Sequence, residues 1–151
     1  MKFNCSKATF LAAAIAAALV APAALALEFR SVEGVAVLYD APSAKGKKLF
    51  VIRRQTPVEV VVNLEGWAKV RDADGTLAWI EKKVLSEKRT TIVTAPRAEI
   101  RQSPDAASTL VFEAEKGVAL ELVDPGKDGW AKVTHADGQG GFVRSSQVWG
   151  L

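Results

Sequence analysis

The chain has 151 residues, of which 49% are apolar and 25% are charged, and its formal net charge is +3. A charge this small argues against a nucleic-acid-binding domain, which needs a clustered basic surface to neutralise phosphates. The single cysteine, Cys5, lies close to the amino terminus. The rest of the chain must therefore be stabilised by apolar burial, without disulfides.

Residues 1–26 are predicted to be a helical signal peptide. Lys2 and Lys7 give a basic start, the apolar run over 10–20 is shorter than the ~20 residues of a spanning helix, and 24–26 has the small-x-small pattern of a cleavage site. Cleavage after Ala26 removes both lysines, so that 18 of the 20 Lys and Arg remain against 17 Asp and Glu, a net charge of +1. This predicts a periplasmic protein; an uncleaved anchor and full secretion are the alternatives.

Short runs of alternating apolar residues follow and predict β-strands. The pattern is clearest at Val58, Val60 and Val62, where β-branched residues recur with period two. In this half we expect strands at 35–39, 49–52, 58–62, 67–71 and 77–80. Asp74-Gly75 is a strong hairpin signal between the last two, because both residues tolerate positive φ. A single helical or 3₁₀ turn is expected at 81–85.

The second half shows the same pattern. Strands are expected at 98–102, 110–113, 118–123, 130–134 and 139–143, with a short turn at 145–148. No stretch after the signal peptide keeps a helical period. About five short strands in about 60 residues favour a small barrel, because closing a sheet removes its exposed edges. The predicted fold is therefore all-β.

The two halves are copies of one unit. Gly-Trp-Ala-Lys-Val occurs at 66–70 and again at 129–133, and an Ala-Asp-Gly turn and an aromatic-aliphatic pair follow each copy at the same spacing. A repeat of this kind predicts two domains, at 27–87 and 88–151. The polar segment 86–90 between them is short and lacks the Gly, Ser or Pro richness of a flexible linker, so we expect the two domains to touch.

These motifs resemble the bacterial SH3-like domain, which occurs in tandem in exported and cell-envelope proteins. Residues 37–43 resemble its first strand and the loop that follows, 66–70 its Gly-Trp-x-Lys-Val strand, and 79–85 its closing strand and turn. In the second half, 100–104 and 141–148 have these roles. The resemblance implies two tandem SH3-like small barrels. It also implies a binding module, with cell-wall peptide or protein as the usual suggested ligand.

The polyproline groove of eukaryotic SH3 domains is not reproduced. Such a groove aligns two tyrosines, a tryptophan and a proline, whereas the first half offers only Tyr39 and Trp67. In the second half, Arg101 takes the place of Tyr39. We therefore do not expect polyproline recognition.

The sequence offers little for catalysis. A nucleophile needs a base within reach, and after the signal peptide the chain has no cysteine and a single histidine, His135. This residue lies beside a predicted hairpin turn and is interpreted as a solvent-facing strand end. The carboxylates show no metal-binding spacing, and no glycine-rich phosphate loop is present. We therefore predict a protein that is not an enzyme and has no metal or cofactor.

The repeated tryptophans are the candidate binding residues. If Ala68 and Val70 face the core, Trp67 faces outward beside a lysine. The candidate binding residues are Tyr39, Trp67, Lys69, Trp130 and Lys132. The alternative is that each Trp packs under a loop or at the seam between the barrels. Trp79 and Phe142 are expected in the two cores, and Trp149 is expected to cap its barrel or the seam.

A basic face is expected on the first barrel. It comprises Lys45, Lys47, Lys48, Arg53 and Arg54. Such a group can attract an anionic partner, for example wall polymers, lipid headgroups or an acidic protein, or it can simply be solvated surface.

Two functions fit the sequence. One is non-catalytic binding of peptidoglycan or its stem peptides in the cell envelope. The other is a protein–protein adaptor in the periplasm that has no cell-wall ligand. Either way the expected partner is a cell-wall polymer or an envelope protein, with no nucleic acid and no membrane span after signal cleavage.

Overall fold

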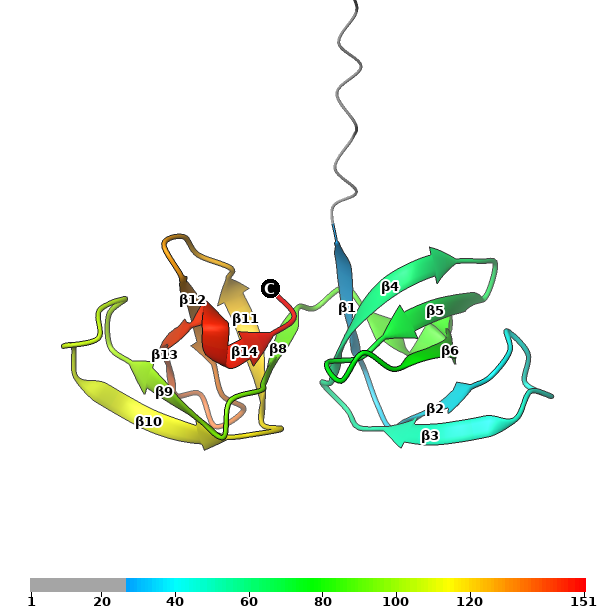
Figure 1. The fold of residues 1–151 in the computed structure, drawn as a ribbon, viewed down its shortest axis with the longest axis horizontal. Coiled ribbons are helices and arrows are strands. Elements are labelled where there is room, and N and C mark those ends of the chain that lie inside the picture. Colours follow the sequence, from blue (N-terminus) through cyan, green and yellow to red (C-terminus); the bar gives the residue numbers. More distant parts are fainter. Residues whose placement is uncertain (1–26) are drawn as a thin grey trace, which may run out of the picture.

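The computed structural model describes residues 27–151, so the predicted signal peptide and its cleavage site lie outside the described residues. The described chain forms two antiparallel sheets of seven strands, one for each sequence copy (Figure 1). Its helical elements are the two 3₁₀ turns η1 (Lys82–Val84) and η2 (Ser145–Gln147). The all-β prediction is thus confirmed for residues 27–151.

The first sheet is built from seven strands in the order β3-β2-β6-β5-β4-β1-β7. Their bounds are β1 (Glu28–Val32), β2 (Ala36–Tyr39), β3 (Lys48–Ile52), β4 (Pro57–Asn63), β5 (Trp67–Arg71), β6 (Leu77–Glu81) and β7 (Leu85–Ser86). The second sheet has the matching order β10-β9-β13-β12-β11-β8-β14. Its strands are β8 (Thr90–Val93), β9 (Arg97–Arg101), β10 (Leu110–Glu115), β11 (Ala119–Asp124), β12 (Trp130–Thr134), β13 (Gly140–Arg144) and β14 (Val148–Trp149).

Each sheet curls around its own apolar core, but the predicted closure is not seen, because each sheet has two edge strands. Hydrogen bonding ends at β3 and β7 in the first sheet and at β10 and β14 in the second. We call the two units the first and second barrels. Among the strands longer than two residues, β1 and β8 were not predicted. The first of them mixes charged and apolar residues, and the second begins inside the segment interpreted as a linker.

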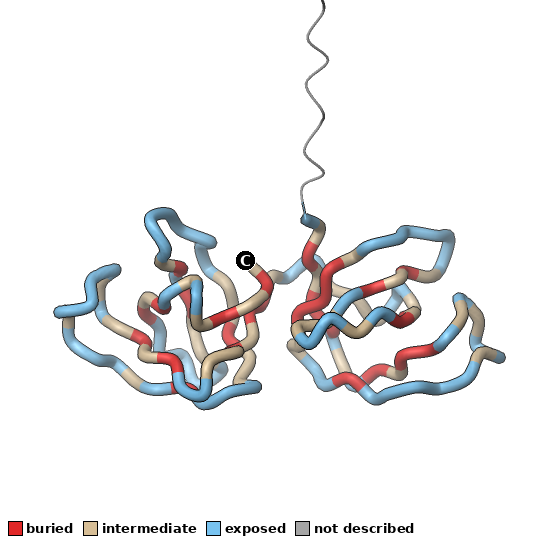
Figure 2. The backbone as a smooth tube through the Cα atoms, viewed as in Figure 1, coloured by how far each residue is buried: buried red, intermediate tan, exposed pale blue. Residues whose placement is uncertain are grey.

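Each barrel has its own apolar core. Buried residues alternate with more exposed ones along β5, β6, β9, β12 and β13, and Figure 2 shows the buried positions gathered within each unit. The first core contains Val32, Ala36, Leu38, Ile52, Val58, Ala68, Val70, Ala78 and Ile80. The second contains Val93, Ala98, Ile100, Ala114, Leu120, Ala131, Val133, Val143 and Val148. Most of these side chains are small or β-branched, which suits the narrow interior of a short barrel.

The predicted Asp-Gly hairpin joins β5 to β6. Gly75 has a φ of +85°, a conformation that glycine adopts without steric cost. The Asp72 carboxylate accepts hydrogen bonds from the backbone N–H groups of Asp74 at 3.0 Å and Thr76 at 2.8 Å. This turn fixes the register of the hairpin and so decides which side chains of β5 and β6 face each other.

The barrels touch through a small aromatic seam. Phe29 of β1 meets Trp149 of β14 edge-on, with ring centroids 5.1 Å apart. The Arg89 guanidinium lies 5.3 Å from the Phe29 ring and donates a hydrogen bond to the Gly150 carbonyl at 3.0 Å. Burial lowers the pKa of Arg89 from its usual value. Trp149 is therefore at the seam, one of the two places expected for it.

Replacing Phe29 by alanine is expected to lower the free energy of unfolding by about 2 kcal/mol, because the variant loses an edge-to-face pair, a cation–π contact and buried apolar area. Urea denaturation followed by circular dichroism measures the change. Phe50→Ala is the matched control, since Phe50 is 53% exposed, and it should stay within about 0.5 kcal/mol of wild type. Equal effects of the two substitutions would contradict a stabilising seam.

Candidate functional site

The strand pair β5–β6 separates core residues from outward-facing ones. Ala68 and Val70 are each 1% exposed, as the sequence predicts, and Trp67 and Lys69 alternate with them on the opposite face. The register pairs Lys69 with Trp79 and Trp67 with Glu81. Directly paired residues share a face of the sheet, so these four side chains project on the same side.

Strand β2 adds a third aromatic ring to this group. Tyr39 pairs with Trp79 in the register, and its ring meets Trp67 edge-on at 5.4 Å and 88°. The Lys69 ammonium lies 5.9 Å from the centre of the Trp79 ring. We call this group the first aromatic face: Tyr39, Trp67, Lys69, Trp79 and Glu81. It brings together three of the predicted binding residues and adds Trp79 and Glu81, which were not among them.

The prediction that Trp79 and Phe142 occupy the cores is wrong. Both are half-buried on the outer face, and the core positions belong to the aliphatic residues after them, Ile80 and Val143. The prediction rested on the position of each ring directly before an aliphatic residue in the closing strand. The strict alternation of β6 would have placed Trp79 with Glu81 on the outer face.

One carboxylate lies at the edge of the first aromatic face. The Glu81 carboxylate bonds the Lys83 ammonium at 2.5 Å, and this hydrogen bond and the charge of Glu81 raise the pKa of Lys83. A shallow hollow of about 170 Å³ opens beside Tyr39 and Glu81. Tyr39 is only 9% exposed, so the face offers a ligand mainly the half-buried Trp67 and Trp79 rings and the Glu81 carboxylate. Such a combination suits a peptide or sugar that has apolar surface and hydrogen-bond donors.

The second barrel presents a related face that carries a positive charge where the first face has the Glu81 carboxylate. Trp130 pairs with Arg144, and Lys132 pairs with Phe142, which puts an arginine where the first barrel has Glu81. The Arg144 guanidinium lies 4.8 Å from the centre of the Trp130 ring. Arg101 pairs with Phe142 and takes the place of Tyr39. We call this group the second aromatic face: Arg101, Trp130, Lys132, Phe142 and Arg144.

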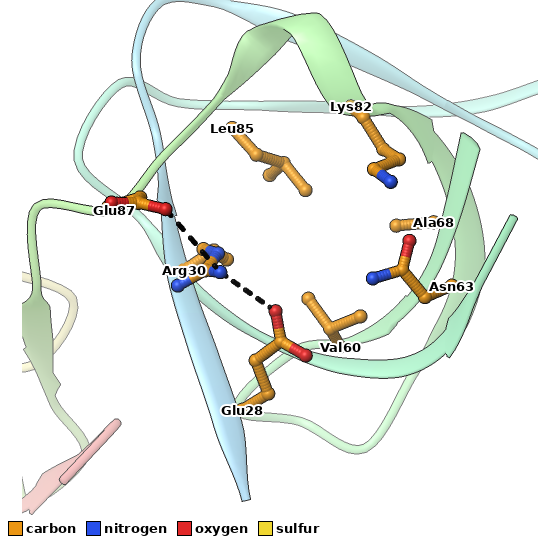
Figure 3. A pocket seen from close by; sticks show the side chains of 8 residues that line it. All are labelled: Glu28, Arg30, Val60, Asn63, Ala68, Lys82, Leu85 and Glu87. Atoms are coloured by element: carbon orange, nitrogen blue, oxygen red, sulfur yellow. Dashed lines mark ion pairs between the residues drawn. The ribbon is translucent and has the colours of Figure 1, made fainter. Parts of the chain in front are cut away.

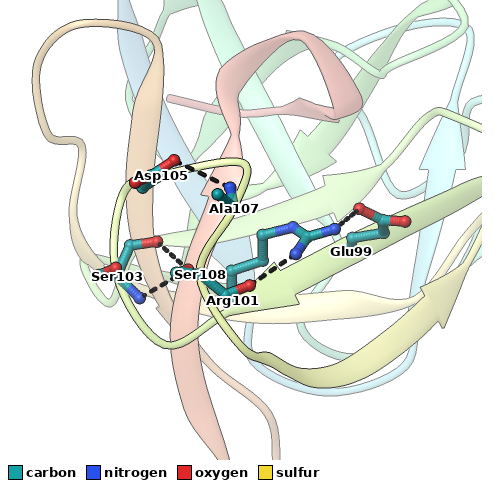
Figure 4. Close-up of polar contacts among 6 residues, drawn as sticks. All are labelled: Glu99, Arg101, Ser103, Asp105, Ala107 and Ser108. Carbon is teal, nitrogen blue, oxygen red and sulfur yellow. Dashed lines mark hydrogen bonds and ion pairs between the residues drawn. The ribbon is translucent and has the colours of Figure 1, made fainter.

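Arg101 is held in place by its own neighbourhood (Figure 4). Its guanidinium donates hydrogen bonds to the Glu99 carboxylate at 2.5 Å and to the Ser108 carbonyl at 2.7 Å. The Ser108 hydroxyl in turn donates to the carbonyl of Ser103 at 3.0 Å, which ties the loop between β9 and β10 together. With its charge partly compensated, Arg101 gives the second face a fixed planar surface.

The predicted basic residues lie near the two ends of β3. Three are in the preceding loop and at the first position of the strand, and two follow the strand. All are exposed, and none forms an ion pair within residues 27–151: Lys45, Lys47, Lys48, Arg53 and Arg54. Between them Leu49, Phe50 and Val51 are also exposed, so this edge strand is apolar with basic ends.

His135 lies at the turn before β13. Its Nδ1 is 3.0 Å from the Asp137 carboxylate, and its ring lies 5.9 Å from that of Phe112. Hydrogen bonds from the Gln139 backbone and from His135 lower the pKa of Asp137. The contacts of His135 thus belong to the turn and to the neighbouring strand β10. Among residues 27–151, no group of three or more His, Cys, Asp or Glu side chains is arranged to hold a metal ion.

The described part of the chain contains no helix of the length and apolarity needed to cross a membrane. A family model described as "Bacterial SH3 domain" matches residues 32–87 and 94–150. No curated protein matches the sequence.

Among solved structures, NlpC2 from Trichomonas vaginalis is similar at 16% identity and a TM-score of 0.39, over 82% of this chain and 48% of that one. An NlpC/P60 family protein from Bacillus cereus ATCC 10987 is similar at 16% identity and a TM-score of 0.38, over 81% of this chain and 56% of that one. The chain spans about half the length of these proteins, and likeness at this level carries no argument about function.

Proposed function

The chain belongs to the bacterial SH3 domain family in both of its halves, and from this premise we propose that it is an exported, non-catalytic binding module of the cell envelope. Its ligand in this proposal is peptidoglycan or its stem peptides. The predicted signal peptide supports export to the periplasm. The contacts of His135 within its own turn and with Phe112 support a role in structure instead of catalysis.

The observation that carries the proposal is the first aromatic face. Trp67 and Trp79 lie outside the core on neighbouring strands, and Tyr39 holds Trp67 edge-on. Rings in this arrangement give a ligand large contact area at little cost in side-chain entropy. The adjacent Glu81 can accept hydrogen bonds from a peptide amide or a sugar hydroxyl.

Retention on purified sacculi at low salt tests the proposal. Wild type should be retained, and Trp67→Ala should weaken binding by about 30-fold, the effect of losing one central aromatic contact worth about 2 kcal/mol. The Trp130→Ala variant and the double variant show whether the second aromatic face contributes. Phe50→Ala removes an exposed ring at another place and should bind like wild type.

Each variant is first checked for an unchanged melting temperature. If wild type is not retained at low salt, the proposal that the protein binds the cell wall is wrong. If the folded Trp67→Ala variant is retained as well as wild type, the first aromatic face is not the cell-wall binding site.

A second function is favoured by the edge strand β3. Leu49, Phe50 and Val51 are exposed between the basic ends of this strand, and its outer edge has no strand partner in the sheet. An edge of this kind can pair with an extended segment of another protein. This supports the adaptor, with an acidic envelope protein as its partner. The Phe50→Ala variant tests it, since loss of partner binding with retention on sacculi unchanged would separate the two surfaces.

A further inference from the structure

A hollow of about 240 Å³ opens in the first barrel (Figure 3). Its lining residue Ala68 alternates with Trp67 along β5, so the hollow lies on the opposite face of this strand from the first aromatic face. It is lined by Glu28, Arg30, Val60, Asn63, Ala68, Lys82, Leu85 and Glu87. Val60, Ala68 and Leu85 form apolar walls, and the polar side chains stand on two opposite sides of them (Figure 3). Apolar walls with a few converging polar groups are the usual composition of a small-molecule site.

One side of the hollow carries a net negative charge. Glu28 and Arg30 alternate with the core residue Val32 along β1, so their side chains face the interior of the barrel. The Arg30 guanidinium lies 3.0 Å from the Glu28 carboxylate and 3.9 Å from that of Glu87. Two carboxylates therefore share one cation, which leaves about one negative charge on this side.

The other side carries a positive charge and an amide. The backbone N–H of Lys82 donates to the Gly66 carbonyl at 3.0 Å, which fixes the start of η1. The Lys82 ammonium forms no ion pair within residues 27–151, whereas that of its neighbour Lys83 is bonded to Glu81. Asn63 and Lys82 both extend toward the open space (Figure 3).

The second barrel shows which of these residues the fold itself requires. Matching registers place Leu122, Ala131 and Val148 at the three apolar wall positions, so the apolar walls occur in both barrels. The charged residues are not repeated. The pairs in the two barrels are Glu28 and Arg89, Arg30 and Thr91, Lys82 and Ser145, and Glu87 and Gly150. The fold therefore does not require this combination of charged residues, and of the two barrels the first alone has it.

We propose that this hollow binds a small zwitterion, namely an α-amino acid or a peptide that has both of its ends free. The ligand carboxylate lies toward Lys82 and Asn63, its ammonium group lies toward Glu28 and Glu87, and its small side chain packs against Val60 and Leu85. A ligand with only one charge leaves the opposite side of the hollow uncompensated. The site does not depend on the proposed wall binding, because the first aromatic face lies on the other side of β5.

The probe is the dipeptide alanyl-alanine, titrated into ¹⁵N-labelled protein and followed by NMR. Amide shifts are expected in β1 and around Lys82, while the Trp67 indole signal should stay in place. Acetylating the amino end or amidating the carboxyl end should each weaken binding at least about fivefold, since each modification removes one charge-assisted contact.

Lys82→Ser introduces the residue that the second barrel has at this position, and it should weaken binding about tenfold. Lys83→Ser is the matched control and should change the affinity less than twofold, because Lys83 is already bonded to Glu81. Both lysines are exposed, so neither substitution disturbs the core. Absence of shifts at millimolar dipeptide, equal binding of the capped forms, or unchanged binding by Lys82→Ser would each overturn the proposal. None of these outcomes affects retention on sacculi.

Discussion

Replacing Ile80 by alanine is expected to lower the free energy of unfolding of the first barrel by about 4 kcal/mol. The Ile80 side chain is completely buried and packs in the first core with Ala68 and Val70. Truncating it removes apolar contacts and leaves a cavity that rigid strands cannot close. A domain of this size has only about 5–15 kcal/mol of net stability, so a large fraction of it is lost. Urea denaturation monitored by circular dichroism measures the effect.

The neighbouring Trp79→Ala substitution is the control. It removes a larger side chain, but Trp79 is only half-buried and lies on the outer face of β6. We expect a loss of about 1 kcal/mol, mostly from contacts with its neighbours on that face. If Trp79→Ala were more destabilising than Ile80→Ala, the assignment of the two faces of β6 would be wrong.

The comparison of these two residues shows what sequence periodicity can establish. The bounds of β5 were predicted correctly at 67–71, and the alternation of Ala68 and Val70 with Trp67 and Lys69 gave the correct faces. The same rule applied to β6 places Ala78 and Ile80 in the core and Trp79 on the outer face. The core of a short barrel is filled by residues such as alanine and valine, and there is little room for an indole ring.

The unpredicted strands β1 and β8 form by pairing with strands that are distant in the sequence. β1 pairs with β4 and β7, and β8 pairs with β11 and β14. Thr90 and Thr91 of β8 are buried although they are polar, so local composition favours a linker there. They are buried because β8 lies between β11 and β14 in the second sheet. The hydrophobic period and turn residues of a short sequence window do not encode this pairing.

The candidate sites also differ in whether local sequence or distant strand pairing brings their residues together. The Trp67–Lys69 pair could be found because it lies within one repeated motif. The contact of Trp67 with Tyr39 depends on the pairing of β2 with β6, in which Tyr39 lies opposite Trp79, 40 positions later (79 − 39). Arg30 and Lys82 both line the charged hollow, but they lie near the start and near the end of the sequence of the first barrel. No sequence spacing indicates that they come together.

A second large effect is expected from replacing Gly141 by alanine, which should lower the free energy of unfolding of the second barrel by about 3 kcal/mol. Gly141 is buried in β13, and a Cβ atom there would lie 2.5 Å from the Arg101 carbonyl oxygen and 2.8 Å from Cγ2 of Ile100. Both obstacles belong to β9, which pairs with β13, so β9 must move away to accommodate the methyl group. Thermal and urea denaturation measure the loss.

Two controls separate this close approach from a general intolerance of glycine replacement. A Cβ at Gly34 would meet nothing within 4 Å, and Gly34→Ala is expected to change the stability by no more than about 0.5 kcal/mol. In the first barrel the matching position is Ala78, which is 2% exposed, so that barrel already accommodates the methyl group. Ala78→Gly should cost about 1 kcal/mol through backbone entropy and lost packing.

The displacement of β9 also predicts an effect on the second aromatic face. Arg101 is the last residue of β9 and reaches this face only through its pairing with Phe142. Moving the strand therefore shifts the guanidinium relative to the rings while leaving the first aromatic face untouched. Gly141→Ala should change the NMR signals of Trp130 and leave those of Trp67 in place. If the variant were as stable as wild type with Trp130 unperturbed, the two strands would have to lie farther apart than described.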